Sequence, residues 1–192
     1  RLLEVLPIEY DQLGQVHERI GNDNAYVAPA NVFRTADGQW LTFTAAVQNV
    51  FERFCASIGR EELIRDPRFR DNASRMRHAA EANAIVGEWI AGVTLAKAVE
   101  QLSAAGVSVA PILSNRQIAE DPHFIARGAI AKVKDADFGE VAVPCVVPRL
   151  SATPGEARTA GPAMGAHNAE IYGGWLGLTD TEQAGLREAG VI

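Results

Sequence analysis

The stretch NVFRTADGQWLTFTAAVQNVFERFCASIG, residues 31–59, decides the fold that we expect for this chain. Two runs rich in β-branched and aromatic residues flank Asp37-Gly38, where glycine accepts the positive φ that a tight hairpin turn needs. After the second run, apolar side chains recur at helical spacing. These side chains are Val50, Phe51, Phe54, Cys55 and Ile58. We therefore expect a β-hairpin followed by a helix that buries one face against it.

The junction between the second strand and the helix, Thr44-Ala45-Ala46, is built from small residues. Small side chains at the start of a helix let an anionic or carbonyl-bearing ligand approach the main-chain N–H groups. Such junctions also occur where a chain merely packs, so the residues alone leave a ligand site and a packing corner both open.

Composition and charge narrow the class of protein. Hydrophobic residues make up 47% of the 192 residues, a share typical of a globular protein that buries a core. The 24 acidic and 18 basic side chains give a formal charge of −6, and no cluster of lysines and arginines offers a footprint for nucleic acid. No apolar run has the length of a membrane span, and we find no signal-peptide pattern. We expect no nucleic-acid partner and no membrane insertion.

The positions of the cysteines and histidines argue against a disulfide framework and a metal site. Cys55 and Cys145 lie far apart in apolar surroundings, which is typical of buried thiols in a reducing compartment, so we expect a cytoplasmic protein. The four histidines have no metal-ligand spacing, and we assign no metal site. His167 opens an expected helix, which leaves a functional role open beside a packing role. The chain has no P-loop, no Gly-x-Gly-x-x-Gly and no Gly-x-Ser-x-Gly motif.

The remaining segments predict helices joined by short strands and loops. Helices are expected over residues 72–91, 95–105 and 167–176 and after a capping box of Thr179 and Glu182. Strands are expected over residues 107–113, 129–133 and 140–147. In the first of these helices we place Arg75 and Arg77 on the outward face. Asp66 and Asp121 each precede a proline, a pair that predicts a helix cap more strongly than a catalytic carboxylate.

Several short motifs, taken together in their order and spacing, resemble the second half of family III (CaiB/BaiF-type) CoA-transferases. They are Gly21-Asn22, Ala28-Pro29, Phe33-Arg34-Thr35-Ala36-Asp37-Gly38, Phe54-Cys55-Ala56-Ser57-Ile58-Gly59, Asp66-Pro67-Arg68-Phe69, Ala105-Gly106-Val107, Ala110-Pro111-Ile112, Asp121-Pro122, Arg127-Gly128, Ser151-Ala152-Thr153-Pro154-Gly155 and Gly161-Pro162-Ala163-Met164-Gly165-Ala166-His167-Asn168. They extend from about residue 20 to the end of the chain.

The resemblance implies an α/β protein longer than this chain, with a Rossmann-like large domain built from both ends and a smaller domain inserted between them. Residues 1–20 would be a linker from the large domain, and residues 21–128 a small α/β domain of hairpin plus helices. Residues 129–192 would be the returning segment that completes the large domain. The first residue is Arg1 and not Met, which agrees with a piece of a longer protein. Family members are interlocked homodimers, so a partner copy and an amino-terminal half are also implied.

The activity that the resemblance implies is transfer of coenzyme A between carboxylic acids through an aspartyl covalent intermediate. Acyl-CoA and a carboxylic acid would be the substrates, and no separate cofactor is expected. The attacking aspartate belongs to the half that this chain lacks, so we assign no catalytic residue and expect the chain alone to be inactive. The mobile loop that closes over the thioester matches a segment that we call the elbow. It consists of Thr44, Ala45, Ala46, Val47 and Gln48.

Two alternatives stay open beside the transferase. An isomerase of the same fold, of the α-methylacyl-CoA racemase type, would move a proton next to the thioester. Racemases resemble a carboxylate-bearing version of the elbow, whereas this chain has Val47 nearest to that place, which favours the transferase. The chain could also be a non-catalytic subunit that contributes only the small domain and a dimer interface.

The elbow of this chain has alanines where other members of the family have glycine. This lowers the mobility that we expect of the elbow but does not change its position.

Overall fold

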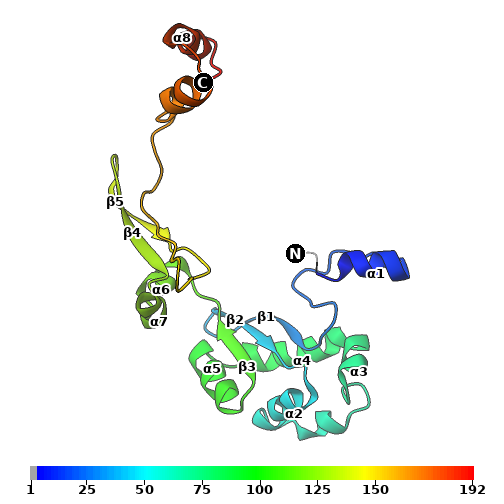
Figure 1. Cartoon of the computed structure of the whole chain (residues 1–192). Helices are drawn as coiled ribbons and strands as arrows, with labels where there is room; N and C mark the ends of the chain where they lie inside the picture. Colours follow the sequence, from blue (N-terminus) through cyan, green and yellow to red (C-terminus); the bar gives the residue numbers. More distant parts are fainter. Residues whose placement is uncertain (1–3) are drawn as a thin grey trace. The chain divides into compact units, whose positions relative to one another are not determined.

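The computed structural model describes residues 4–192, and the chain divides into two compact units, Arg1–Ser114 and Asn115–Ile192 (Figure 1). The first unit contains a three-stranded sheet with helices packed on it, and the second contains a two-stranded hairpin and short helices. This mixture confirms the α/β fold class. None of the helices between residues 4 and 192 combines the length and apolarity needed to cross a membrane.

The first described helix, α1 (Leu6–Leu13), lies in a part of the chain that we expected to be only a tail and a linker. Pro7 lies in its first turn, where a missing N–H is tolerated, and Gly14 ends it with a left-handed φ of 65°. The Glu9 carboxylate accepts a 2.8 Å hydrogen bond from the Tyr26 hydroxyl. This contact ties the helix to the segment that enters the first strand.

The sheet consists of β1 (Ala30–Arg34), β2 (Trp40–Thr44) and β3 (Ser108–Pro111), in that order. Both strand pairs are antiparallel, and Phe33 pairs with Leu41 across the first hairpin. Gly38 has a φ of 76° in the turn, a conformation that a residue with a side chain rarely adopts. The predicted hairpin and the predicted strand beside it are confirmed.

One face of this sheet is buried by helices. The helices are α2 (Gln48–Ser57), α4 (Ala79–Ala91) and α5 (Leu95–Ala104). The sheet contributes Phe33, Leu41 and Phe43 to the core, and α2 contributes Phe51, Phe54 and Cys55. Burial of each large apolar side chain stabilises the fold by about 1.5–3 kcal/mol. The amphipathic pattern that predicted α2 therefore describes its packing.

The prediction of one helix over residues 72–91 is wrong, because the chain bends at His78 between α3 (Asn72–Arg77) and α4. His78 has φ −122° and ψ 33°, and its N–H donates to the Arg75 carbonyl at 3.0 Å. The buried residues of α3 are polar, whereas the apolar face of α4 starts at Ala82. Periodicity joined the two helices because spacing along a sequence does not report a change of axis.

The helix cap predicted at Asp66 is also wrong, because the residues that follow form a turn. The 3-10 helix η1 (Glu61–Arg65) ends just before it, and the Asp66 carboxylate accepts a 2.9 Å hydrogen bond from the Arg68 N–H. The cap of α3 is Asp71, whose carboxylate accepts a 2.6 Å hydrogen bond from the Ser74 N–H. An aspartate before a proline suits a turn as well as a helix start.

The second unit has its own short elements. They are α6 (Asn115–Glu120), α7 (Pro122–Arg127), β4 (Ile130–Asp135), β5 (Gly139–Pro144), the π-helix η2 (Ala169–Trp175) and α8 (Asp180–Glu188). The antiparallel pair of β4 and β5 confirms the second predicted hairpin. Asp121 caps α7 through the His123 N–H at 2.8 Å, and the capping box of Thr179 and Glu182 opens α8, both as predicted.

The domain limits expected from the resemblance describe how the chain would divide within a longer protein, and they stay predictions. In this chain the division falls after Ser114, so α6 and α7 belong with the second hairpin and not with the first sheet. The completion of a Rossmann-like domain by residues 129–192 also stays a prediction.

Acid should destabilise the first unit through its cap and turn carboxylates. The Ser74 N–H lowers the pKa of Asp71, and the Thr35 hydroxyl lowers the pKa of Asp37. A carboxyl whose folded pKa lies below its unfolded value stabilises the fold above the unfolded pKa, and this contribution is lost as the pH falls through the folded pKa. We expect a level melting temperature from about pH 7 to 5 and a decrease below about pH 4.

Circular dichroism melts across this pH range measure the effect. The variant Asp71→Asn keeps a cap acceptor that does not titrate, so its melting temperature should fall less than that of the parent between about pH 5 and 3. An equal fall in both proteins would contradict the role assigned to Asp71.

Candidate functional site

The elbow joins the end of β2 to the start of α2. Thr44 and Val47 are exposed, Ala46 and Gln48 are half-buried, and Ala45 is fully buried. The Ala45 N–H donates to the Pro29 carbonyl at 3.0 Å, whereas Val47 is 63% exposed. The predicted site residues therefore form one bend that is anchored at Ala45 and open to solvent at Val47.

The start of α2 has no side-chain cap among the residues that the structure describes. Val47 occupies the N-cap position with an extended backbone, and its side chain has no acceptor to offer. The first N–H groups of a helix have no partner inside the helix and bear a partial positive charge. They can donate to an anion or to a carbonyl oxygen, so Val47 leaves the donors of α2 available to a ligand.

A buried arginine lies beneath the elbow. Arg75 of α3 is 0% exposed, and its guanidinium donates to the Ala46 carbonyl and to Oε1 of Gln48, both at 2.6 Å. The same group donates to the carbonyls of Ala28 and Phe69 at 2.7 and 3.0 Å. One side chain therefore fixes the elbow to the segment before β1 and to the turn before α3.

The prediction that Arg75 faces solvent is wrong, and Arg75 is the site residue that sequence reasoning missed. In the single helix expected over residues 72–91, position 75 precedes Ala79 by four residues and Ala82 by seven, so helical spacing alone would have placed it on the inward stripe. An arginine on an apolar stripe is the signal that could have identified it. Arg77, which we also placed outward, is exposed.

The Arg75 guanidinium and the uncapped start of α2 both adjoin the elbow. Burial lowers the pKa of Arg75, but an arginine stays charged at neutral pH. Its guanidinium lies 4.6 Å from the centroid of the Phe51 ring, and Nε2 of Gln48 extends the network to Oε1 of Glu52 at 3.0 Å. This arrangement favours a ligand oxygen that carries or develops negative charge.

A shallow depression of about 240 Å³ lies next to the elbow, on β2 and β3. It is lined by Thr42, Phe43, Thr44, Ser108, Val109 and Ala110. Thr44 is exposed and belongs to both the depression and the elbow. The bend is therefore accessible from outside and is not enclosed in the hydrophobic core.

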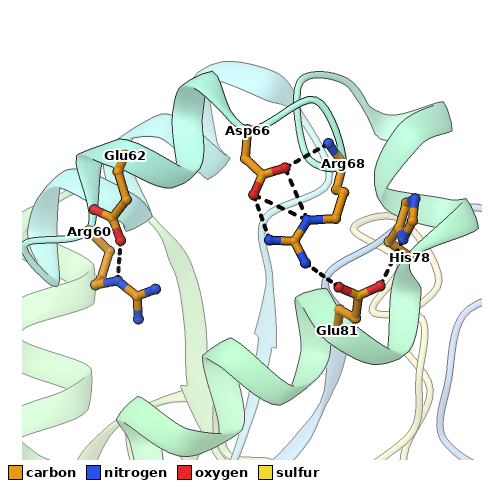
Figure 2. Close-up of polar contacts among 6 residues, drawn as sticks. All are labelled: Arg60, Glu62, Asp66, Arg68, His78 and Glu81. Atoms are coloured by element: carbon orange, nitrogen blue, oxygen red, sulfur yellow. Dashed lines mark hydrogen bonds and ion pairs between the residues drawn. The ribbon is translucent and has the colours of Figure 1, made fainter.

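Carboxylates near the turn after η1 are committed to ion pairs (Figure 2). Arg68 lies between Asp66 and Glu81 at N–O distances of 2.7 and 2.6 Å, and Glu81 also lies 2.8 Å from Nδ1 of His78. The contact with His78, and then that with Arg68, lowers the pKa of Glu81, and Arg68 lowers the pKa of Asp66. Carboxylates stabilised as anions in this way are poor proton acceptors at neutral pH.

The remaining candidate groups are histidines and cysteines. No cluster of histidine, cysteine, aspartate and glutamate between residues 4 and 192 could hold a metal ion. His17, His78 and His167 lie beside Glu9, Glu81 and Glu170 respectively. Cys55 and Cys145 are free thiols, and burial raises the pKa of Cys55 to about 12. The Cys55 thiol is therefore protonated and unreactive at neutral pH.

Comparison with protein families matches residues 1–168 to the family described as CoA-transferase family III. The chain belongs to CoA-transferase family III. It is 40% identical over 191 residues to succinyl-CoA–D-citramalate CoA-transferase of Chloroflexus aurantiacus, a match that covers 100% of this chain and 48% of that protein. It is 34% identical over 184 residues to formyl-CoA:oxalate CoA-transferase of Streptomyces avermitilis, covering 95% of this chain and 45% of that protein.

A solved structure of a CaiB/BaiF family protein from Brucella suis has the same fold over 88% of this chain and 43% of that chain, with a TM-score of 0.68 and 24% identity. The match to the family model confirms the resemblance identified from the sequence motifs. This family III chain spans less than half the length of the curated relatives that it matches.

The difference between the two thiols gives a direct test of the core. In the native chain, a small maleimide should label Cys145, which is half-buried, while Cys55 stays unmodified because it is fully buried and protonated. Mass spectrometry of the peptides after a short reaction at neutral pH measures this. In denaturant both cysteines should react, which serves as the control, and rapid native labelling of Cys55 would contradict the packing of α2.

Proposed function

We propose that this chain is the carboxyl-terminal part of an acyl-CoA:carboxylate CoA-transferase, and that the elbow closes over the thioester in the complete enzyme. The observation that carries the proposal is the uncapped start of α2, which lies above the buried Arg75 in a chain of this family. The relatives are named for succinyl-CoA and formyl-CoA, which favours a short carboxylic acid as the acyl group.

In this proposal the elbow binds the thioester carbonyl and a group outside the chain attacks it. An aspartate carboxylate adds to the carbonyl carbon, the C–S bond breaks, and coenzyme A leaves as a thiolate. The thiolate then attacks the aspartyl carbonyl, which releases the first acid and leaves coenzyme A on the aspartate for transfer to a second acid. The N–H groups of α2 would stabilise the negative charge that develops on the thioester oxygen.

The elbow composition supports a transferase over an isomerase of the same fold. An isomerase needs an ionisable group that removes a proton next to the thioester. The five elbow residues have no such side chain, and Val47 stands nearest to the place where racemases have a carboxylate. A non-catalytic role for the complete protein would require that it lack the aspartate altogether.

The same proposal includes the substrates, the assembly and the cellular compartment of the complete enzyme. Acyl-CoA and a carboxylic acid are the proposed partners, with no cofactor besides coenzyme A as substrate. The complete enzyme would be an interlocked homodimer that contains an amino-terminal half. Two free cysteines agree with a reducing, cytoplasmic compartment.

Isotope transfer tests the reaction class. The complete protein is incubated with an acyl-CoA labelled in its coenzyme A portion and an unlabelled acid, in deuterated water. A transferase produces a new labelled CoA thioester of the added acid, whereas an isomerase only incorporates deuterium next to the thioester. Residues 1–192 alone should give neither product, and turnover by them alone would refute the assignment of the nucleophile to another segment.

Replacing Val47 with aspartate tests the stability of the fold and the binding of acyl-CoA separately. Aspartate at this N-cap position should bond the N–H groups of α2, and so raise the free energy of unfolding by about 0.5–2 kcal/mol. The same bonds would occupy the donors for the thioester oxygen, so we expect the KM for acyl-CoA in the complete enzyme to rise about tenfold.

Thermal melts and steady-state kinetics measure the two effects of Val47→Asp. The matched control is Val47→Asn, which caps the helix without adding a charge and so isolates donor occupancy from repulsion. A more stable Val47→Asp enzyme with an unchanged KM would show that the elbow does not bind the thioester.

A further inference from the structure

Arg75 is enclosed in the first unit without a carboxylate in direct contact among the described residues. Its four hydrogen bonds go to three main-chain carbonyls and one side-chain amide, all of them neutral. Burying a charge among neutral groups costs several kcal/mol relative to water, and an apolar side chain of similar volume is often as stable. Stability alone therefore does not explain an arginine at this position.

The four acceptors lie on three separate segments of the chain, one of which is the elbow. Ala28 precedes β1, Phe69 lies in the turn before α3, and Ala46 lies in the elbow itself. The guanidinium is a rigid planar fork, so acceptors bound to its different N–H groups are held at fixed angles to one another. Its position over the Phe51 ring adds α2 to the same arrangement.

The half-buried Gln48 side chain extends this arrangement from Arg75 to α2. Because arginine has only donors, the Gln48 amide must present its oxygen to Arg75, and its nitrogen then donates to Glu52 one turn later. The Gln48 side chain is therefore held along α2. In this orientation it does not cap the first N–H groups of that helix.

We propose that Arg75 is a positioning residue, which holds the elbow main chain through Ala46 and holds the Gln48 side chain along α2, so that the α2 donors stay aimed at the ligand. Its consequence for catalysis rests on the proposed function of the elbow. Misplacement of binding groups by about 1 Å is enough to reduce an enzymatic rate by about 100-fold. Arg75 would keep the α2 donors in place without touching the substrate.

Hydrogen exchange in the 192-residue chain, without substrate, tests the positioning role directly. The variant Arg75→Met keeps the apolar stem and removes the fork. We expect exchange of the hydrogen-bonded amides of Ala45, Val50 and Phe51 to increase about tenfold while the sheet amides stay protected. The matched control is Arg53→Met, because the exposed Arg53 also donates to a main-chain carbonyl, that of Gly106 at 2.8 Å, but away from the elbow. Unchanged elbow exchange in a folded Arg75→Met chain would overturn the proposal.

A second variant keeps the test decisive if Arg75→Met does not fold. Gln48→Ala removes only the outer end of the network and leaves the buried charge with its three carbonyl partners. We expect faster exchange of the hydrogen-bonded Val50 and Phe51 amides, with a melting temperature within a few degrees of the parent. Protection equal to that of the parent at these amides would overturn the relay through Gln48.

Kinetics in the complete enzyme separate this inference from the proposed function. If the elbow binds the thioester, Arg75→Lys should raise the KM for acyl-CoA about tenfold, since an ammonium group has no planar fork to hold all four acceptors. A loss of folded enzyme would instead lower kcat at constant KM. Faster elbow exchange combined with an unchanged KM would support the positioning role and refute the elbow as the thioester lid.

Discussion

The Arg75 guanidinium reaches the main chain of Ala28, Ala46 and Phe69 from a fully buried position, so three stretches distant in sequence are held at fixed angles. Apolar packing around Phe51 supplies most of the stabilisation in this region, but packing has no direction and would tolerate several arrangements of the bend. The hydrogen bonds of a planar fork select one of them. The elbow has a defined shape because a directional interaction is embedded in a non-directional core.

The elbow combines close packing at Ala45 with a helix start that has no side-chain cap. Ala45 lies in the core, which allows the strand and the helix to meet closely, while Val47 occupies the N-cap position and leaves the first turn of α2 without a side-chain acceptor. Helix ends are normally satisfied by a capping side chain, by water or by a ligand. A helix start that is uncapped, partly exposed and positioned by a buried cation is suited to hold an oxygen that gains charge during a reaction.

The chain belongs to CoA-transferase family III and spans less than half the length of the relatives that it matches. The described residues supply helix N–H donors, a buried guanidinium and an accessible depression beside Thr44. The carboxylates of Asp66 and Glu81 are neutralised by Arg68, and the thiol of Cys55 is buried. The proposed function therefore assigns the binding and orientation of the thioester to this chain and the covalent step to another segment.

The amino-acid sequence alone determined the first hairpin, the amphipathic α2, the caps at Asp121 and Thr179, and the family, because each depends on neighbours within a few residues or on a pattern of short motifs. Sequence also located the elbow, since a strand-to-helix junction is a local feature. Only the tertiary structure decided the bend at His78, the turn at Asp66 and above all the burial of Arg75. The acceptors of Arg75 lie up to 47 residues away along the chain, and no local pattern reports that they converge on one side chain.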